Sequence, residues 1–142
     1  MPLVSITRLR VRSWRYLPAF FVAALRSASQ ARRAKDNLAV TILREAHNTF
    51  WTRSIWANEG AMKAFMVSGV HRTVMPRLLN WCDEASVARW TQDSDQQPTW
   101  DEVHLRMQSD GRSSRVNYPS EAHRRFQIPA LVMKRSKELR FR

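Results

Sequence analysis

The densest group of side chains that could bind a ligand lies in one short stretch, residues 49–56, which reads TFWTRSIW. Its β-branched and aromatic residues are typical of a strand. Alternation along a strand places Trp51 and Arg53 on one face and Trp56 on the other. Aromatic rings around a buried guanidinium could hold a planar or carboxylate-bearing ligand. An aromatic stripe in a strand, however, more often belongs to a core.

Histidine is the next residue type that could do chemistry, and the chain has four, at positions 47, 71, 104 and 123. No two are four residues apart, and neither HxH nor HExxH occurs, so a zinc or di-iron site lacks support. His71 lies on a predicted helix that is capped by Asn58 and carries Phe65 on its apolar stripe. Helix geometry places His71 roughly 140° from that stripe, which favours a surface or dimer-facing position over an inward one.

The single cysteine, Cys82, excludes an internal disulfide and a zinc cluster built on cysteines. Beside Trp81 it is interpreted as a packed apolar residue, and such a chain suits a reducing cytoplasm. The Gly-rich motifs of dinucleotide and P-loop sites are absent, and the acidic residues are dispersed. Neither a catalytic nucleophile nor a pair of catalytic carboxylates can be assigned from the sequence.

The chain is strongly basic, with 24 Lys and Arg against 12 Asp and Glu and a net charge of +12. The excess is spread out: residues 1–92 hold 14 basic and five acidic side chains, and residues 93–142 hold ten and seven. An acidic partner such as nucleic acid or an anionic membrane is the functional explanation. An Arg-rich solvated surface is the other.

The N-terminal region imitates a targeting signal, because arginines precede the apolar run from Tyr16 to Leu25 and small residues follow it. Pro18 interrupts that run, which is also far shorter than the roughly 20 residues that span a bilayer. We therefore expect a buried helix over residues 17–32, with Pro18 in its first turn, and no membrane partner.

The remaining elements follow from hydrophobic periodicity. Strands are predicted over residues 3–12, 37–45, 49–56 and 85–91, with a turn at His47-Asn48. The second helix begins at Asn58 and is kinked or restarted by Pro76. A change of parity in the first strand predicts a bulge, or a strand covered on both faces. The order is β-α-β-β-α-β, which predicts an α+β, ferredoxin-like antiparallel sheet with both helices on one face.

That arrangement leaves the other sheet face bare. A C2 homodimer that buries it is therefore expected, and a monomer would need the tail to cover it. We take residues 1–92 as this domain and residues 93–142 as a C-terminal helix and basic tail. The run Thr99-Trp100-Asp101-Glu102 is a capping box for a helix that ends near Gly111. Residues 134–142 are basic and expected to be mobile.

The stretch from Phe50 to His71, FWTRSIWANEGAMKAFMVSGVH, resembles the strand-to-helix passage of the antibiotic-biosynthesis monooxygenases. In that group an aromatic-ended strand precedes an acidic first turn, an Ala-hydrophobic pair and a histidine near the helix end. The chain resembles an uncharacterised bacterial branch of the dimeric α/β-barrel superfamily and, more distantly, the spheroidene monooxygenases. The resemblance covers about two thirds of the chain and implies a dimeric α/β barrel with a pocket between each sheet and its helices.

The resemblance also implies a choice of chemistries, since some relatives oxygenate small hydrophobic or polycyclic ligands without a metal and others bind or degrade haem. The haem-degrading relatives use an Asn on the first strand, where this chain has Ser5 and Thr7. They also use a Trp and a His ten residues apart, where it has Phe65 and Met75. That degrading site is therefore not expected here. His71 approximates a histidine of the group, so haem binding through His71 stays open.

Three functions remain open from the sequence. The first is a monooxygenase-type pocket protein, cofactor-independent or haem-linked, that binds a small hydrophobic, polycyclic or haem-like ligand. The second is RNA or single-stranded DNA binding, since RNA-recognition domains share the element order, although their Gly-containing third-strand signature is absent. The third is a non-catalytic dimer that presents its tail to a partner. For the first function, the candidate ligand-binding residues are His71, Trp51, Arg53, Trp56 and Phe65.

Overall fold

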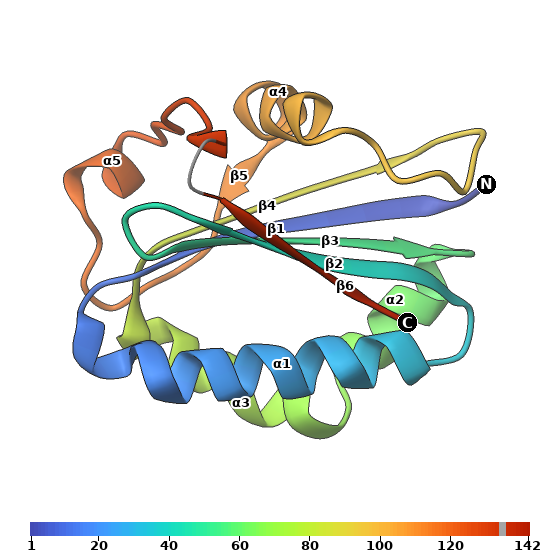
Figure 1. Ribbon diagram of the computed structural model, residues 1–142, viewed down its shortest axis with the longest axis horizontal. Helices are drawn as coiled ribbons and strands as arrows, with labels where there is room; N and C mark the ends of the chain where they lie inside the picture. Colours follow the sequence, from blue (N-terminus) through green and yellow to red (C-terminus); the bar gives the residue numbers. More distant parts are fainter. Residues whose placement is uncertain (134–135) are drawn as a thin grey trace.

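The computed structural model describes residues 1–133 and 136–142 and has the predicted α+β, ferredoxin-like architecture. Among these residues, six strands form one antiparallel sheet in the order β5-β4-β1-β3-β2-β6. The strands are β1 (Leu3–Val11), β2 (Asn37–Glu45), β3 (Thr49–Trp56), β4 (Cys82–Thr91), β5 (Arg112–Ser113) and β6 (Lys137–Phe141). Helices α1 (Leu17–Arg33), α2 (Glu59–Met66) and α3 (Gly69–Trp81) lie on one face, and α4 (Trp100–Asp110) lies on the other (Figure 1).

Strand β1 lies at the centre of the sheet, between β3 and β4, and both of its faces are covered. Val4 and Ile6 pack in the hydrophobic cluster beneath α4, whereas Leu9 and Val11 pack in the cluster beneath α1 and α3. A shift of register beside Arg10 also marks a bulge in its pairing with β4. The change of parity between Ile6 and Leu9 therefore reflects a strand covered on both faces, and the bulge lies beyond it.

The β2–β3 hairpin turns where the sequence predicted it. His47 and Asn48 both have left-handed backbone conformations, with φ of 62° and 58°. His and Asn adopt this conformation more readily than most residues. The tight turn fixes the register of β2 against β3, and β3 then pairs with β1 along its whole length.

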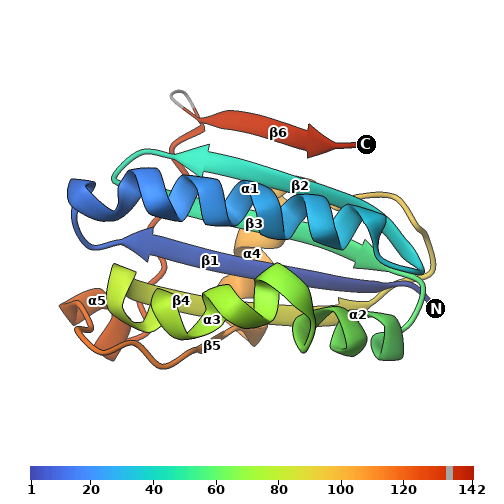
Figure 2. The same cartoon turned by 90° about the horizontal axis from the view of Figure 1, so that it is seen from below.

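Helix α1 lies along the sheet beside α3, as seen from the helix side (Figure 2). Pro18 occupies its first turn, where no backbone donor is needed, as predicted. Its buried side chains are mostly alanines, which let the helix approach the strands closely. The segment that imitates a targeting signal is thus a core helix. Within the described residues, no helix has the length and apolar character to cross a membrane.

The second predicted helix is two helices, and the break is not at Pro76. Asn58 caps α2 as expected, its side chain accepting a hydrogen bond from the Ala61 N–H at 2.8 Å. The chain then leaves the helix at Val67 and restarts at Gly69, whose φ of 55° is left-handed. A glycine adopts that conformation without steric cost. Pro76 lies inside α3, so the predicted restart at Pro76 was wrong, and a kink there stays a prediction.

The sheet face expected to be bare is covered by the chain itself. Thr99 caps α4 through the Glu102 N–H at 3.2 Å, and the helix ends at Gly111, as predicted. Three buried residues of α4, Trp100, Val103 and Met107, join Val4, Ile6, Trp51 and Ile55 in one cluster. The expectation of an open face was therefore wrong. The homodimer that rested on it stays a prediction.

The C-terminal segment is also engaged with the sheet. Strand β6 pairs with β2 from Arg44 to Val40, so the expected mobility of residues 134–142 was wrong for residues 137–141; residues 134 and 135 lie outside the described residues. Strand β5 extends the other edge beside β4, and a short helix, α5 (Glu121–Arg124), follows. The predicted division between residues 92 and 93 stays a prediction, but side chains from both sides of it form one core.

Candidate functional site

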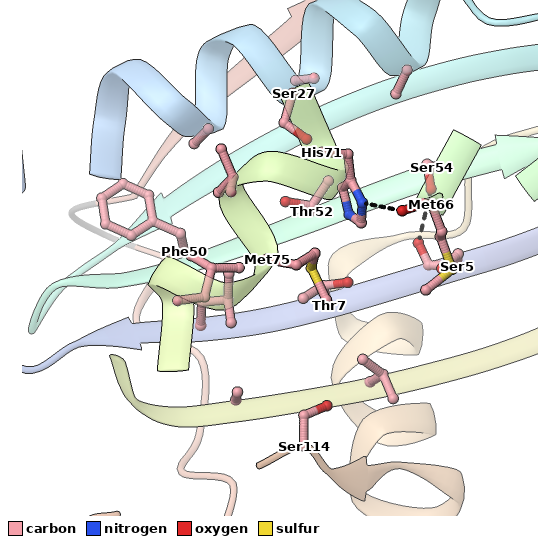
Figure 3. Close-up of a pocket in the computed structure, with 18 of the residues that line it drawn as sticks. Ser5, Thr7, Ser27, Phe50, Thr52, Ser54, Met66, His71, Met75 and Ser114 are labelled. Atoms are coloured by element: carbon pink, nitrogen blue, oxygen red, sulfur yellow. Dashed lines mark hydrogen bonds between the residues drawn. The ribbon is translucent and has the colours of Figure 1, made fainter. Parts of the chain in front are cut away.

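A cavity of about 190 Å³ lies between the sheet and the helices α1, α2 and α3. Strands β1, β2, β3 and β4 supply its floor, α1 forms one wall, and α2 and α3 form the other (Figure 3). Most of the lining is aliphatic or aromatic, as in typical small-molecule sites. The polar groups in it are few, and their positions follow from the strand register and the helix break.

The cavity floor carries a polar patch in an otherwise apolar sheet face. Ser5 of β1 is paired with Ser54 of β3, and Thr7 is paired with Thr52, so two rows of hydroxyls cross the central strands. The first row continues to Arg89 of β4, which is paired with Ser5 on the other side. Ser5, Thr7 and Thr52 are only half-buried although they lie in central strands, because they face the cavity.

These hydroxyls were missed by the sequence reasoning, although the sequence carries a signal for them. Every second residue of β1 from Leu3 onward faces the helices, and the series runs Leu3, Ser5, Thr7, Leu9, Val11. If that face of the strand packed against a core along its whole length, all of these positions would be expected to be apolar. Two adjacent polar positions on the inward side of a central strand therefore indicate a lined cavity, and β3 shows the same interruption.

Three of the five predicted ligand-binding residues form one aromatic wall of this cavity. The Trp56 and Phe65 rings are stacked with centroids 5.3 Å apart. The Phe65 ring meets the His71 ring at 4.6 Å with the planes tilted. Trp56 comes from β3, Phe65 from α2 and His71 from α3, so strand and both helices contribute to the wall. Aromatic rings of this kind can pack against a planar ligand face to face or edge to face.

His71 lines the cavity, so the expected surface or dimer-facing position is wrong. The helical wheel drawn from α2 does not extend through the break at Val67, and α3 starts in a new direction. Two contacts fix the side chain and its turn: the His71 Nδ1 lies 3.1 Å from the Met66 carbonyl, and the His71 N–H donates to Gln30 Oε1 at 3.0 Å. Figure 3 shows the imidazole lying over the sheet floor beside Met66.

The protonation of His71 follows from these contacts. A carbonyl oxygen can only accept, so Nδ1 carries the hydrogen and the neutral ring keeps its lone pair on Nε2. Burial lowers the pKa of His71 from its ordinary value of 6.5, and the bond to Met66 opposes that shift only in part. At pH 7 the cavity therefore contains a neutral imidazole whose Nε2 can accept a proton.

Arg89 is the second functional candidate, and the sequence reasoning did not identify it. Its Nη2 lies 3.4 Å from the sulfur of Met66, the residue that also contacts His71. Its Nε is fully buried and has no hydrogen-bond partner among the described residues. Burial lowers the pKa of Arg89, and the nearby Arg112 acts in the same direction. The guanidinium stays charged at neutral pH, because arginine is effectively always protonated.

The charged side chains of the cavity favour an anion. The lining includes Arg89, Arg115 and His71 but no Asp or Glu side chain of the described residues. Arg115 is exposed and lies toward the opposite end, next to Ser114, whose N–H donates to the Ala85 carbonyl. The cavity is thus apolar and positively charged, with its least solvated cation at Arg89.

Trp51 and Arg53, the other two predicted site residues, lie on the opposite face of the sheet. Arg53 is buried beneath α4 with its guanidinium 4.2 Å from the Trp100 ring. It donates to Gln97 Oε1 at 2.8 Å, to the Pro98 carbonyl at 2.7 Å and to Glu138 at 3.0 Å. The Trp51 indole N–H donates to Glu45 Oε1 at 2.9 Å. The structure therefore divides the predicted group, as strand alternation alone required.

Cys82 is fully buried at the start of β4. Burial raises the pKa of its thiol to about 12, and the neighbouring Asp83 acts in the same direction. Cys82 is therefore a thiol at neutral pH and packs as an apolar side chain. Within residues 1–133 and 136–142, no group of three or more His, Cys, Asp or Glu side chains is placed to hold a metal ion.

The profile of a family described as a domain of unknown function (DUF3291) matches residues 20–115, more than half of the chain. The chain belongs to the DUF3291 family. The matched region runs from within α1 through β5, so it includes α4 and most of the cavity lining but not the part that β1 supplies. No curated protein matches the sequence.

Solved structures place this DUF3291 protein in the fold of the antibiotic-biosynthesis monooxygenases. SnoaB from Streptomyces nogalater, a cofactor-independent oxygenase, is 16% identical with a TM-score of 0.56, covering 66% of this chain and 94% of its own. A candidate antibiotic biosynthesis monooxygenase from Nitrosomonas europaea is 18% identical with a TM-score of 0.56, covering 65% and 90%. A conserved protein from Methanosarcina mazei Go1 is 11% identical with a TM-score of 0.59, covering 66% and 94%. At these identities the likeness is one of fold.

Proposed function

We propose that this DUF3291 protein binds a compact, mainly apolar ligand with a hydroxyl group in the cavity, and that His71 accepts the hydroxyl proton. The observation that carries the proposal is the Nε2 lone pair of a neutral imidazole in an apolar cavity. A general base must be unprotonated at working pH and within reach of its substrate. His71 meets the first condition through burial and the second through its place in the cavity wall.

The proton transfer has a simple balance. The Nε2 lone pair takes the hydroxyl proton, the ligand oxygen keeps the electron pair, and the Met66 carbonyl holds the imidazolium that forms. The resulting anion is electron-rich and poorly solvated in the apolar cavity. An anion of this kind can pass an electron to dioxygen. The same site could therefore begin a cofactor-independent oxygenation, and the fold shared with SnoaB supports that reaction type.

The size and shape of the cavity restrict the ligand. Its volume of about 190 Å³ lies below the roughly 300–1,000 Å³ of sites for drug-sized ligands. The stacked Trp56 and Phe65 rings favour a flat molecule, and two fused rings are a suitable size. Haem is at the large end of drug-sized ligands. The residues present offer an axial nitrogen at His71 but not the space for a tetrapyrrole, so haem does not fit this cavity.

The other functions have less support. A nucleic-acid platform would need exposed aromatic residues on the sheet face away from the helices, but Trp51 on that face is fully buried beneath α4. A tail presented to a partner would need a free C-terminus, but β6 is paired with β2. The homodimer and the cytoplasmic compartment stay predictions that the proposal does not require.

The proposal is tested with two ligands that differ in one hydrogen-bond donor, 2-naphthol and 2-methoxynaphthalene. Calorimetric titration at pH 7.5 should give tighter binding of the naphthol, by roughly tenfold for one hydrogen bond in a dry site. In His71→Phe, which removes the acceptor but keeps a ring against Phe65, this preference should disappear while the ether still binds. His104→Phe makes the same change on the opposite face and should leave the preference intact.

Two results would overturn the proposal. If the wild-type protein binds neither ligand, the cavity is not a site for fused-ring molecules. If it binds both equally, or if His71→Phe keeps the preference for the naphthol, then His71 is not the acceptor.

A further inference from the structure

The cavity contains a charged group that proton acceptance by His71 does not use. Arg89 carries its charge into a lining in which the described residues supply no carboxylate. A guanidinium removed from water normally acquires partners for its donors, since an unmet buried donor costs stability. The Nε of Arg89 has none among the described residues, and its Nη2 contacts only a weak acceptor, the sulfur of Met66.

Arg8 is a second arginine with an unmet buried donor, and it differs from Arg89 in how its charge is balanced. Arg8 also has a buried Nε without a partner among the described residues, but its Nη1 donates to Glu84 at 2.7 Å, so its charge is balanced inside the protein. No described carboxylate lies within 4.0 Å of Arg89. The acid that influences it most, Glu59, is exposed and paired with Lys63 at 3.0 Å. The positive charge of Arg89 is therefore not balanced by the protein itself.

Resting on the proposed function, we infer that the ligand carries a carboxylate and that Arg89 binds it at the end of the cavity where β4 meets β1. A carboxylate matches the fork of guanidinium donors and would take up the unused Nε–H. The Ser5 hydroxyl, directly across the strand from Arg89, provides a further donor. Ser54 is already engaged, since its hydroxyl accepts from the Trp56 indole at 3.0 Å and lies 3.4 Å from the Ser5 carbonyl.

The position of Arg89 relative to His71 sets the arrangement of groups on the ligand. Both side chains contact Met66, one through its sulfur and the other through its carbonyl oxygen. A planar ligand lying on the Trp56 and Phe65 wall would therefore present its carboxylate and its hydroxyl on the same side. The ligand class is an aromatic hydroxy acid with these two groups close together.

The test uses a ligand pair of nearly equal shape, 2-naphthoate and its neutral amide 2-naphthamide, titrated calorimetrically into the full-length protein. The wild type should bind the carboxylate more tightly, by roughly tenfold to a hundredfold for a charge-assisted pair. Arg89→Met should abolish that preference. Arg115→Met, which removes the cation at the other end of the cavity, should keep most of it.

The titration is repeated with 2-naphthol so that the inference and the proposed function can fail separately. Arg89→Met should keep the far-ultraviolet circular dichroism spectrum of the wild type, which shows that the variant is folded. If the wild type binds 2-naphthol but does not distinguish carboxylate from amide, the inference is wrong and the proposed function stands. If Arg89→Met keeps the preference for the carboxylate, or if Arg115→Met loses it, Arg89 is not the group that binds the carboxylate. If 2-naphthol does not bind at all, both are wrong.

Discussion

Two arginines lie on opposite faces of the sheet, Arg53 on β3 and Arg89 on β4, the two strands that flank β1. They differ in how their charges are balanced. Arg53 beneath α4 has a carboxylate, an amide, a carbonyl and an aromatic ring around its guanidinium. Arg89 beneath α2 and α3 has one sulfur contact and a buried donor without a described partner. A buried cation with a full set of partners holds structure together, whereas one without them is available to a ligand.

The same difference extends to the two faces as a whole. The α4 face is filled by large side chains, and Arg53 uses its bonds to Gln97, Pro98 and Glu138 to fasten the C-terminal segment to the sheet. The opposite face has hydroxyls at its centre and leaves a cavity between sheet and helices. One face thus fixes the fold, and the other is free to carry a site.

The largest expected effect is on the free energy of unfolding, and it tests whether Arg53 and Arg89 differ in structural role. Arg53→Met should lower the free energy of unfolding by about 3 kcal/mol, because Gln97, the Pro98 carbonyl and Glu138 lose their shared partner. Arg89→Met is the matched control. It should change the free energy of unfolding by no more than about 1 kcal/mol, since it removes an unbalanced buried charge. Urea unfolding of the two variants measures both values, and equal losses would show that the two arginines have the same structural role.

A smaller effect is expected on the pH dependence of the unfolding free energy, and it tests whether His71 is desolvated in the folded protein. Its pKa is lowered in the folded protein, so the unfolded chain binds the proton more readily. The contribution of His71 to the free energy of unfolding is therefore fully present when the pH is above 6.5, the ordinary pKa. It is lost as the pH falls through the lower pKa of the folded state. The decline in unfolding free energy between pH 7 and pH 5 should be smaller in His71→Phe than in the wild type. An identical decline would mean that His71 is not desolvated.

Much of the fold could be predicted because local rules and tertiary structure agree. The strands, the turn at His47-Asn48 and the caps at Asn58 and Thr99 follow from alternation, left-handed turn residues and capping chemistry. The break between α2 and α3 was missed because Pro76 is the more familiar signal. Ser68-Gly69, at which the chain restarts, was the informative pair.

The covering of the second sheet face could not be predicted in the same way. Residues after Gly111 have no clear period, and β6 exists only because β2 offers it an edge. The candidate site was predicted in part, since Trp56, Phe65 and His71 are joined in space. Arg89 could not be recognised from the sequence, because what distinguishes it is a missing partner, and partners are assigned only by the fold.

Ligands are expected to enter the cavity on the helix side and not the face beneath α4, and methionines lie on both sides of the sheet. Met62, Met66 and Met75 line the cavity, and Met107 is buried in the α4 cluster. The most direct measurement is a titration of methyl-¹³C-methionine protein with 2-naphthol, followed by NMR. We predict that the signals of Met62, Met66 and Met75 shift and saturate together while that of Met107 stays in place. If the Met107 signal moves alone, or if none of the four signals moves, ligands do not bind in the cavity on the helix side.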